Sequence, residues 1–188
     1  MKPLQPPSTH QVRAAQGWFE LGNHREATAE LDAIPTALRA HPDVLEVRLS
    51  IYAQAQKWEQ CVYIAEALVV LAPNRPGGWI HRSHALHGLR RTDEALQALL
   101  PAVKKFPNLP TIPYNLACYA CQRGNLENAR GWLKMAFRLA DTRKCKLMAL
   151  EDSDLKALWA EIGNITPNRI KPAGSAPIRS ARRIPNVS

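Results

Sequence analysis

Several kinds of segment and motif are missing from this sequence, and each absence excludes a class of protein. No stretch approaches the roughly 18 consecutive apolar residues that a membrane-spanning helix needs. There is no glycine-rich phosphate loop, no nucleophile elbow and no HExxH pattern. The N-terminal stretch MKPLQPPSTHQ has one lysine and no apolar run, so we expect neither a signal peptide nor a transit sequence. These absences predict a cytoplasmic protein that is not an enzyme.

A dense disulfide framework is also missing. The four cysteines are Cys61, Cys118, Cys121 and Cys145, and all lie within apolar patterns typical of helices. Small secreted domains instead place their cysteines in a dense disulfide framework. The cysteine usage therefore agrees with a reducing compartment.

Acidic residues are missing from the C-terminal end. The formal net charge is +9, and residues 166–188 contain five basic residues and no acid, which leaves +4 for the rest of the chain. This segment is rich in Pro, Ser and Ala, and it has few apolar residues with which to offset the entropy of ordering. We predict a disordered basic tail. It suggests an alternative function, in which Arg179, Arg182 and Arg183 contact the phosphates of a nucleic acid or another anionic surface.

The sequence does contain a regular internal repeat with a period of 34 residues. Small side chains recur one period apart at Ala27, Cys61, Ala95 and Ala129. Prolines keep the same step at Pro42, Pro76 and Pro110. A fixed period of this size indicates one supersecondary unit that has been copied and stacked, each copy being too small to bury its own apolar face.

Each repeat has the pattern of two helices. In the third, Trp79, Ser83 and Leu86 recur at helical spacing, and a second helical pattern follows. The repeated prolines fall where first helices begin, and Gly22 and Gly124 fall where the chain must turn. We therefore predict an all-α solenoid with a flexible N-terminus (1–7), four repeats (8–41, 42–75, 76–109, 110–141) and C-terminal capping helices (142–165).

These features resemble the tetratricopeptide repeat (TPR) family. The matching residues of the third and fourth repeats are Trp79, Leu86, Ala95, Pro107, Leu116, Ala117, Gly124, Ala129 and Ala136. The resemblance implies a right-handed superhelix whose concave face is lined by the first helix of each repeat. It also implies binding of a protein or peptide in that groove rather than catalysis.

This geometry predicts the residues that line the groove. The candidate peptide-binding side chains are Val12, Gln16, Phe19, Glu46, Ser50, Gln54, Ile80, His84, His87, Tyr114 and Cys118. Apolar members would hold ligand side chains, polar members would bond the ligand backbone, and acidic members would favour a basic ligand. The alternative is that about half of them only pack against neighbouring repeats or face water.

Two side-chain pairs suggest a metal site. His84 and His87 lie three residues apart, and Cys118 and Cys121 lie one period further on. Each pair would share a helix face, and two imidazoles with two thiolates match a closed tetrahedral zinc site. The alternative is ordinary packing, since metal-binding cysteines usually come from turns that wrap the ion. The sequence therefore predicts either no cofactor or one structural zinc.

Overall fold

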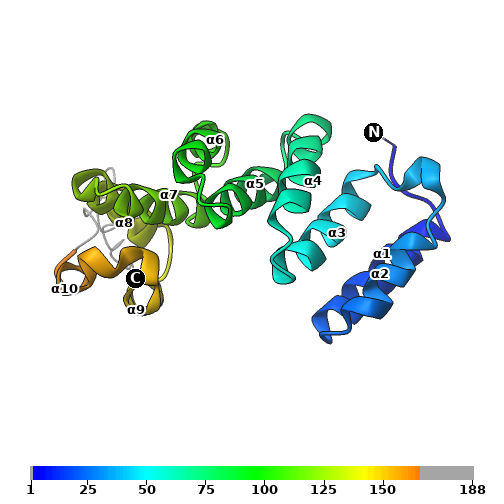
Figure 1. The fold of residues 1–188 in the computed structure, drawn as a ribbon, viewed down its shortest axis with the longest axis horizontal. Helices are drawn as coiled ribbons and strands as arrows, with labels where there is room; N and C mark the ends of the chain where they lie inside the picture. The colour runs from blue at the N-terminus through cyan, green and yellow to red at the C-terminus, as the bar shows by residue number, and fades with distance from the viewer. Residues whose placement is uncertain (1, 166–188) are drawn as a thin grey trace, which may run out of the picture.

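The computed structural model describes residues 2–165, which form ten α-helices and two short 3-10 helices, as predicted for an all-α chain (Figure 1). The α-helices are α1 (Ser8–Glu20), α2 (His24–Asp32), α3 (Pro42–Gln54), α4 (Trp58–Leu71), α5 (Pro76–Gly88), α6 (Thr92–Lys105), α7 (Thr111–Gln122), α8 (Leu126–Leu139), α9 (Thr142–Glu151) and α10 (Trp159–Ile162). The 3-10 helices are η1 (Thr36–Leu38) and η2 (Ser153–Leu158).

Local sequence determines where the helices begin. Pro42 and Pro76 occupy the first turns of α3 and α5, where a missing N–H does no harm. Asn23 and Asn125 cap α2 and α8, because each side chain accepts a hydrogen bond from a backbone N–H three residues later, at 3.2 and 3.1 Å. Prolines thus begin α3 and α5, and asparagine caps begin α2 and α8.

A left-handed residue follows the first helix of every repeat. Gly22 and Gly124 have φ of 77° and 74°, as expected for glycine at such a turn. Gln56 and Arg90, at the equivalent positions of the second and third repeats, have φ of 53° and 64°. The turn therefore keeps its backbone shape even where no glycine is present.

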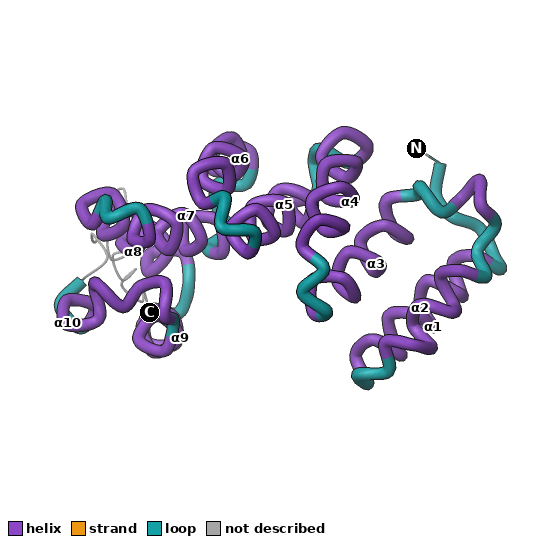
Figure 2. Tube along the Cα trace, viewed as in Figure 1, coloured by secondary structure: helices purple, strands orange, loops and turns teal. Residues whose placement is uncertain are grey.

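Successive helices pack as hairpins, and the hairpins stack in a row (Figure 2). The small residue common to the second helices lies at each close approach: Ala27, Ala95 and Ala129 are fully buried, and Cys61 is 1% exposed. The small side chains that recur in the sequence therefore lie where the second helices are fully enclosed.

Within residues 2–165 the buried core residues form three clusters, and the half-buried Tyr52 and Val62 each pack against two of them. The first joins the α1–α2 hairpin to α3 through residues such as Leu31 and Val44. The second joins α3, α4 and α5 around Leu49 and Leu68, and the third extends from Leu86 to the C-terminal segment. Each part of the chain is therefore stabilised by its immediate neighbours.

None of the described helices has the length and apolar character that crossing a bilayer requires.

Candidate functional site

The first helices of the repeats follow one another along one side of the solenoid. α1 contacts α3, α3 contacts α5, and α5 contacts α7. Side chains four residues apart on these helices point to the same face. This is the side that the resemblance predicts to be concave, here called the concave face, and we describe it from its N-terminal to its C-terminal end.

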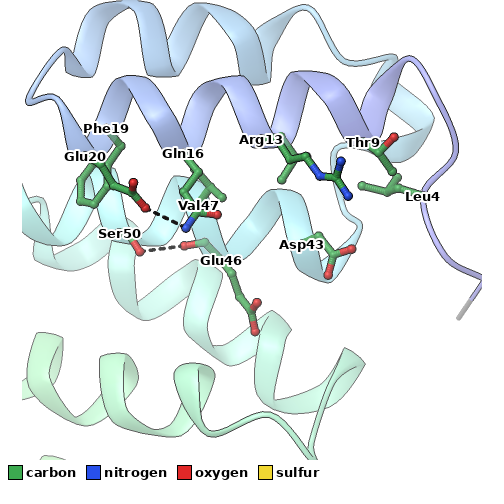
Figure 3. Close-up of a pocket in the computed structure, with 11 residues that line it drawn as sticks. Leu4, Thr9, Arg13, Gln16, Phe19, Glu20, Asp43, Glu46, Val47 and Ser50 are labelled. Atoms are coloured by element: carbon green, nitrogen blue, oxygen red, sulfur yellow. Dashed lines mark hydrogen bonds between the residues drawn. The ribbon is translucent and has the colours of Figure 1, made fainter.

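The N-terminal part of this face is a cavity of about 510 Å³ between α1 and α3 (Figure 3), here called the α1–α3 groove. Its lining residues are Leu4, Thr9, Val12, Arg13, Gln16, Phe19, Glu20, Asp43, Glu46, Val47 and Ser50. Five of the candidate peptide-binding residues are therefore brought together here: Val12, Gln16, Phe19, Glu46 and Ser50.

The groove has mixed chemistry. Val12 and Phe19 are half-buried and pack on the first core cluster. Gln16 donates a hydrogen bond of 3.0 Å to Glu20, and Ser50 donates one of 3.1 Å to the Glu46 carbonyl oxygen (Figure 3). The groove thus combines half-buried apolar side chains with polar groups that are exposed on α1 and half-buried on α3.

Arg75, which precedes α5, neutralises part of the acidic rim. Its guanidinium lies 2.6 Å from an Asp43 oxygen and 3.1 Å from a Glu46 oxygen. These carboxylates raise the Arg75 pKa, chiefly through the hydrogen bond with Asp43. Glu20 is therefore the groove acid that lies away from this arginine.

Sequence reasoning missed several of these residues. Leu4, in the segment for which we predicted flexibility, is only 7% exposed and belongs to the first core cluster. It covers an apolar face that α1 leaves open at the start of the stack, and a lone leucine among prolines gives no periodic signal of this. Arg13 and Val47 also line the groove, and Arg75 was not considered because it lies outside the first helices.

The middle of the concave face is less enclosed. Gln54 is exposed at the end of α3, and Ile80 is half-buried against the third core cluster. His84 is exposed, and its ring meets that of Trp58 edge-on at 5.2 Å between centroids. These three candidates do not line the α1–α3 groove.

The C-terminal part of the face is covered by the chain itself. The Tyr114 hydroxyl donates a hydrogen bond of 2.9 Å to Asp152 Oδ2, and the Cys118 thiol donates to the same oxygen at 3.5 Å. Tyr114 is 7% exposed and Cys118 is 4% exposed. Neither side chain is available to a second polypeptide in this conformation, which differs from our expectation of a groove open along its whole length.

The physical reason is that the C-terminal segment folds back. Asp141 caps α9, and after α9 the chain turns at Asp152 into η2, which packs on α7. Leu155 and Leu158 of η2 are fully buried. Burial of two leucines offsets the cost of placing two half-buried aspartates on this face.

His87 is also engaged by this segment. Its Nε2 lies 3.0 Å from Asp154 Oδ2, and its Nδ1 lies 2.9 Å from Thr92 Oγ1. The 5.0 Å separation of its ring from that of Tyr119 adds an aromatic contact. Both ring nitrogens of this candidate ligand residue therefore already have partners.

The structure does not assemble the four-residue zinc site. Across residues 2–165, the group of potential ligand atoms that lies within 4.8 Å of one another is Cys118 with Asp152 and Asp154. His84 turns toward Trp58, and His87 is bonded to Asp154 and Thr92. The histidines of α5 and Cys118 of α7 therefore contact Trp58, Thr92 and the two aspartates instead of one another, and the sequence pattern did not predict these contacts.

The cysteines have the character of packing residues. All four are buried free thiols. Burial raises the pKa of the Cys61 thiol to about 11, and burial together with Asp152 and Asp154 raises the pKa of Cys118 further. A thiol with a raised pKa is a poor nucleophile at neutral pH, so this arrangement does not favour a redox pair at Cys118 and Cys121.

The predicted basic tail, 166–188, lies outside the described residues, as do its arginines.

The geometry gives this chain the fold of a TPR-type solenoid, built of helices packed in order as stacked hairpins. No protein-family model matches the sequence, and no curated protein matches it significantly. Several solved structures do match, all at low sequence identity.

Three of these structures are as follows. MamA (residues 41 to the end) from Desulfovibrio magneticus RS-1 has 17% identity and a TM-score of 0.66 over 86% of this chain and 94% of that one. The TPR protein TTC0263 from Thermus thermophilus has 19% identity and a TM-score of 0.64 over 83% of each chain. YrrB, described as a TPR protein with an unusual peptide-binding site, has 18% identity and a TM-score of 0.63 over 78% of this chain and 75% of its own. The shared property is the fold, as the 34-residue period predicted.

Proposed function

We propose that this chain is a non-enzymatic interaction module that binds a peptide, or an extended segment of a partner protein, in the α1–α3 groove. The observation that carries the proposal is the cavity of about 510 Å³, in which apolar and polar side chains from two stacked repeats converge. Peptide grooves combine these properties, since apolar pockets give affinity and polar groups fix the backbone.

The groove chemistry favours a particular ligand. An apolar ligand side chain would pack between Val12 and Phe19, and the Gln16 amide can bond a peptide backbone. A lysine or arginine of the ligand would approach Glu20, because Asp43 and Glu46 already hold Arg75. We therefore expect ligands with one apolar anchor close to one basic residue.

Selection from a displayed random-peptide library tests this proposal. Peptides selected on the wild-type protein should lose at least tenfold in affinity against Val12→Glu and Phe19→Ala, because a buried anchor contact contributes roughly 1.4 kcal/mol or more. Glu20→Lys, an exposed change, should select against basic peptides while leaving the helical circular dichroism unchanged.

Val70→Glu is the matched control. Val70 is 77% exposed on α4, outside the groove, so this variant should bind the selected peptides within about twofold of wild type. Selected peptides that bind all three groove variants as tightly as the wild-type protein would refute the proposal.

Two further expectations accompany this function. We propose that the protein works in the cytoplasm, and its four free thiols agree with a reducing compartment. Deletion of residues 166–188 should leave peptide affinity unchanged. If binding is instead lost on deletion and falls steeply with salt, the basic tail is the binding element, as in the alternative function.

A further inference from the structure

The residues covered by the C-terminal segment are the periodic equivalents of the α1–α3 groove residues. Tyr114, Cys118 and Gln122 lie three periods of 34 residues after Val12, Gln16 and Glu20. His87 lies two periods after Phe19. These four residues form a face of α5 and α7, here called the α5–α7 face. It corresponds, near the C-terminal end of the stack, to the α1–α3 groove at the N-terminal end.

The C-terminal segment lies along the α5–α7 face as a bound peptide would. Tyr114 and Cys118 both donate to Asp152, one helical turn apart. One turn further, the Gln122 side chain donates a 3.0 Å hydrogen bond to the Asp154 carbonyl oxygen. Contacts thus follow α7 over three successive positions of one face, rather than meeting at a single point.

The α5–α7 face presents donors, and the segment presents acceptors. A phenol, a thiol and an amide come from α7, and the imidazole of His87 lies 3.0 Å from the Asp154 carboxylate. The acceptors are the carboxylates of Asp152 and Asp154 and the Asp154 carbonyl oxygen. The residue between the two acids, Ser153, is exposed. The α5–α7 face therefore contacts both aspartates and does not select the residue between them.

The segment is also preformed as a ligand. Asp152 Oδ1 accepts a hydrogen bond of 3.0 Å from the Asp154 N–H and so fixes the turn that aims both carboxylates. Leu155 and Leu158 follow as fully buried apolar anchors. An acidic pair followed by apolar anchors is a complete recognition element.

We infer that the α5–α7 face is a second peptide-binding surface, which recognises an Asp-x-Asp segment followed by apolar residues and which the chain's own residues 152–158 occupy. A partner segment of the same chemistry competes for this face. Because the chain's own segment is tethered, its effective concentration is of millimolar order, so the face is closed to weak ligands until that segment is released. This surface is separate from the α1–α3 groove of the proposed function.

A two-part experiment tests the inference on the full chain carrying Asp152→Ala and Asp154→Ala. Amide hydrogen exchange in residues 153–162 should become at least tenfold faster than in wild type, while α4 keeps its exchange rate. A fluorescent synthetic peptide of residues 151–163 should then bind the variant with a Kd at least tenfold lower than that for wild type, measured by anisotropy.

Three controls define the recognition. The same peptide with Asn at both aspartate positions should bind the variant at least tenfold more weakly. Adding Tyr114→Phe to the variant should weaken binding of the Asp peptide several-fold, because it removes one donor to that carboxylate. Val12→Glu, which should abolish binding in the α1–α3 groove, should leave this binding unchanged, so the two proposals can fail separately.

Each negative result would contradict one part of the inference. If the segment is released but the peptide does not bind, the α5–α7 face is not a receptor. If exchange in residues 153–162 does not change, the aspartates do not hold the segment in place. If the Asn peptide binds equally well, only the apolar anchors are recognised and the acidic specificity is wrong.

Discussion

Gly78 in the first turn of α5 lies against the preceding helix. A Cβ added there would meet Leu68 Cβ at 2.9 Å and the Val69 backbone nitrogen at 3.1 Å. Neither atom is the end of a flexible side chain, so the two repeats would have to separate. At this position glycine is required for space rather than for its backbone freedom.

We therefore expect Gly78→Ala to lower the free energy of unfolding by about 1–3 kcal/mol, the usual cost of overpacking. Gly131→Ala on α8 is the matched control, because an added Cβ has no neighbour within 4 Å there. That substitution should raise the stability by roughly 0.5–1 kcal/mol, since alanine is the better helix former. Urea unfolding measures both values, and equal effects at the two sites would contradict this account of α5 packing.

At the scale of an element, the left-handed turn residues show where backbone strain is stored. Gln56 and Arg90 have positive φ at positions where the first and fourth repeats have glycine. A non-glycine residue in this conformation costs roughly 1–2 kcal/mol. The contacts of the two hairpins outweigh that cost.

Gln56→Gly and Arg90→Gly should therefore each stabilise the protein, by up to about 1 kcal/mol after the greater chain entropy of glycine in the unfolded state is subtracted. Gly22→Ala and Gly124→Ala, the reverse change at equivalent turns, should destabilise it by a similar amount. The thermal midpoint of all four variants tests this, and a loss of stability in both glycine variants would show that the turns are not strained.

The elements that sequence predicts well are those specified locally. Pro42, Pro76 and Ala95 recur because every copy needs the same helix start and the same close approach, so the period of 34 predicted the helices and their pairing. Five of the eleven residues that line the α1–α3 groove were among the candidates that this periodicity predicted. The fold-back of η2 does not, because Asp152 and Asp154 have the pattern of ordinary helix starters, and their contacts with Tyr114 and His87 span 38 and 67 residues.

At the scale of the whole molecule, two histidines of α5 make stability depend on pH. Desolvation lowers the pKa of His81, and the charge of His84 lowers it further. Desolvation and His87 lower the pKa of His84, which Asp154 partly opposes. In both cases the folded state binds a proton less readily than the unfolded state.

The stability from these histidines is therefore fully present above the unfolded pKa of about 6.5 and is lost as the pH falls below that value toward the lowered folded values. We expect the urea midpoint to fall between pH 7.5 and pH 5.5. The double variant His81→Gln, His84→Gln should show a smaller fall. An equal fall in wild type and variant would show that other groups cause the acid sensitivity.

The three core clusters predict that the two ends of the solenoid open independently. The α1–α2 hairpin has one neighbouring repeat, and α1 contributes only Ser8 and Ala15 as buried residues. α7 is enclosed by α5, α6, α8 and η2 and contributes nine buried residues. Because stability in a stacked array is the sum of each unit and its interfaces, α1–α2 should open at a lower free energy than α7–α8.

Native-state hydrogen exchange tests this difference with two equivalent substitutions three periods apart. Leu31→Ala and Leu133→Ala each remove a fully buried side chain, at an expected cost of about 2–5 kcal/mol. Leu31→Ala should speed exchange in α1 and α2 and leave α7 and α8 at their wild-type rates, whereas Leu133→Ala should speed exchange in α7, α8 and η2. Within residues 2–165 the first and second clusters meet at α3, so a defect in the first cluster reaches α7 through two intact hairpins. If Leu31→Ala speeds exchange equally at both ends, the molecule unfolds as one cooperative unit. The core clusters then do not open with separate free energies.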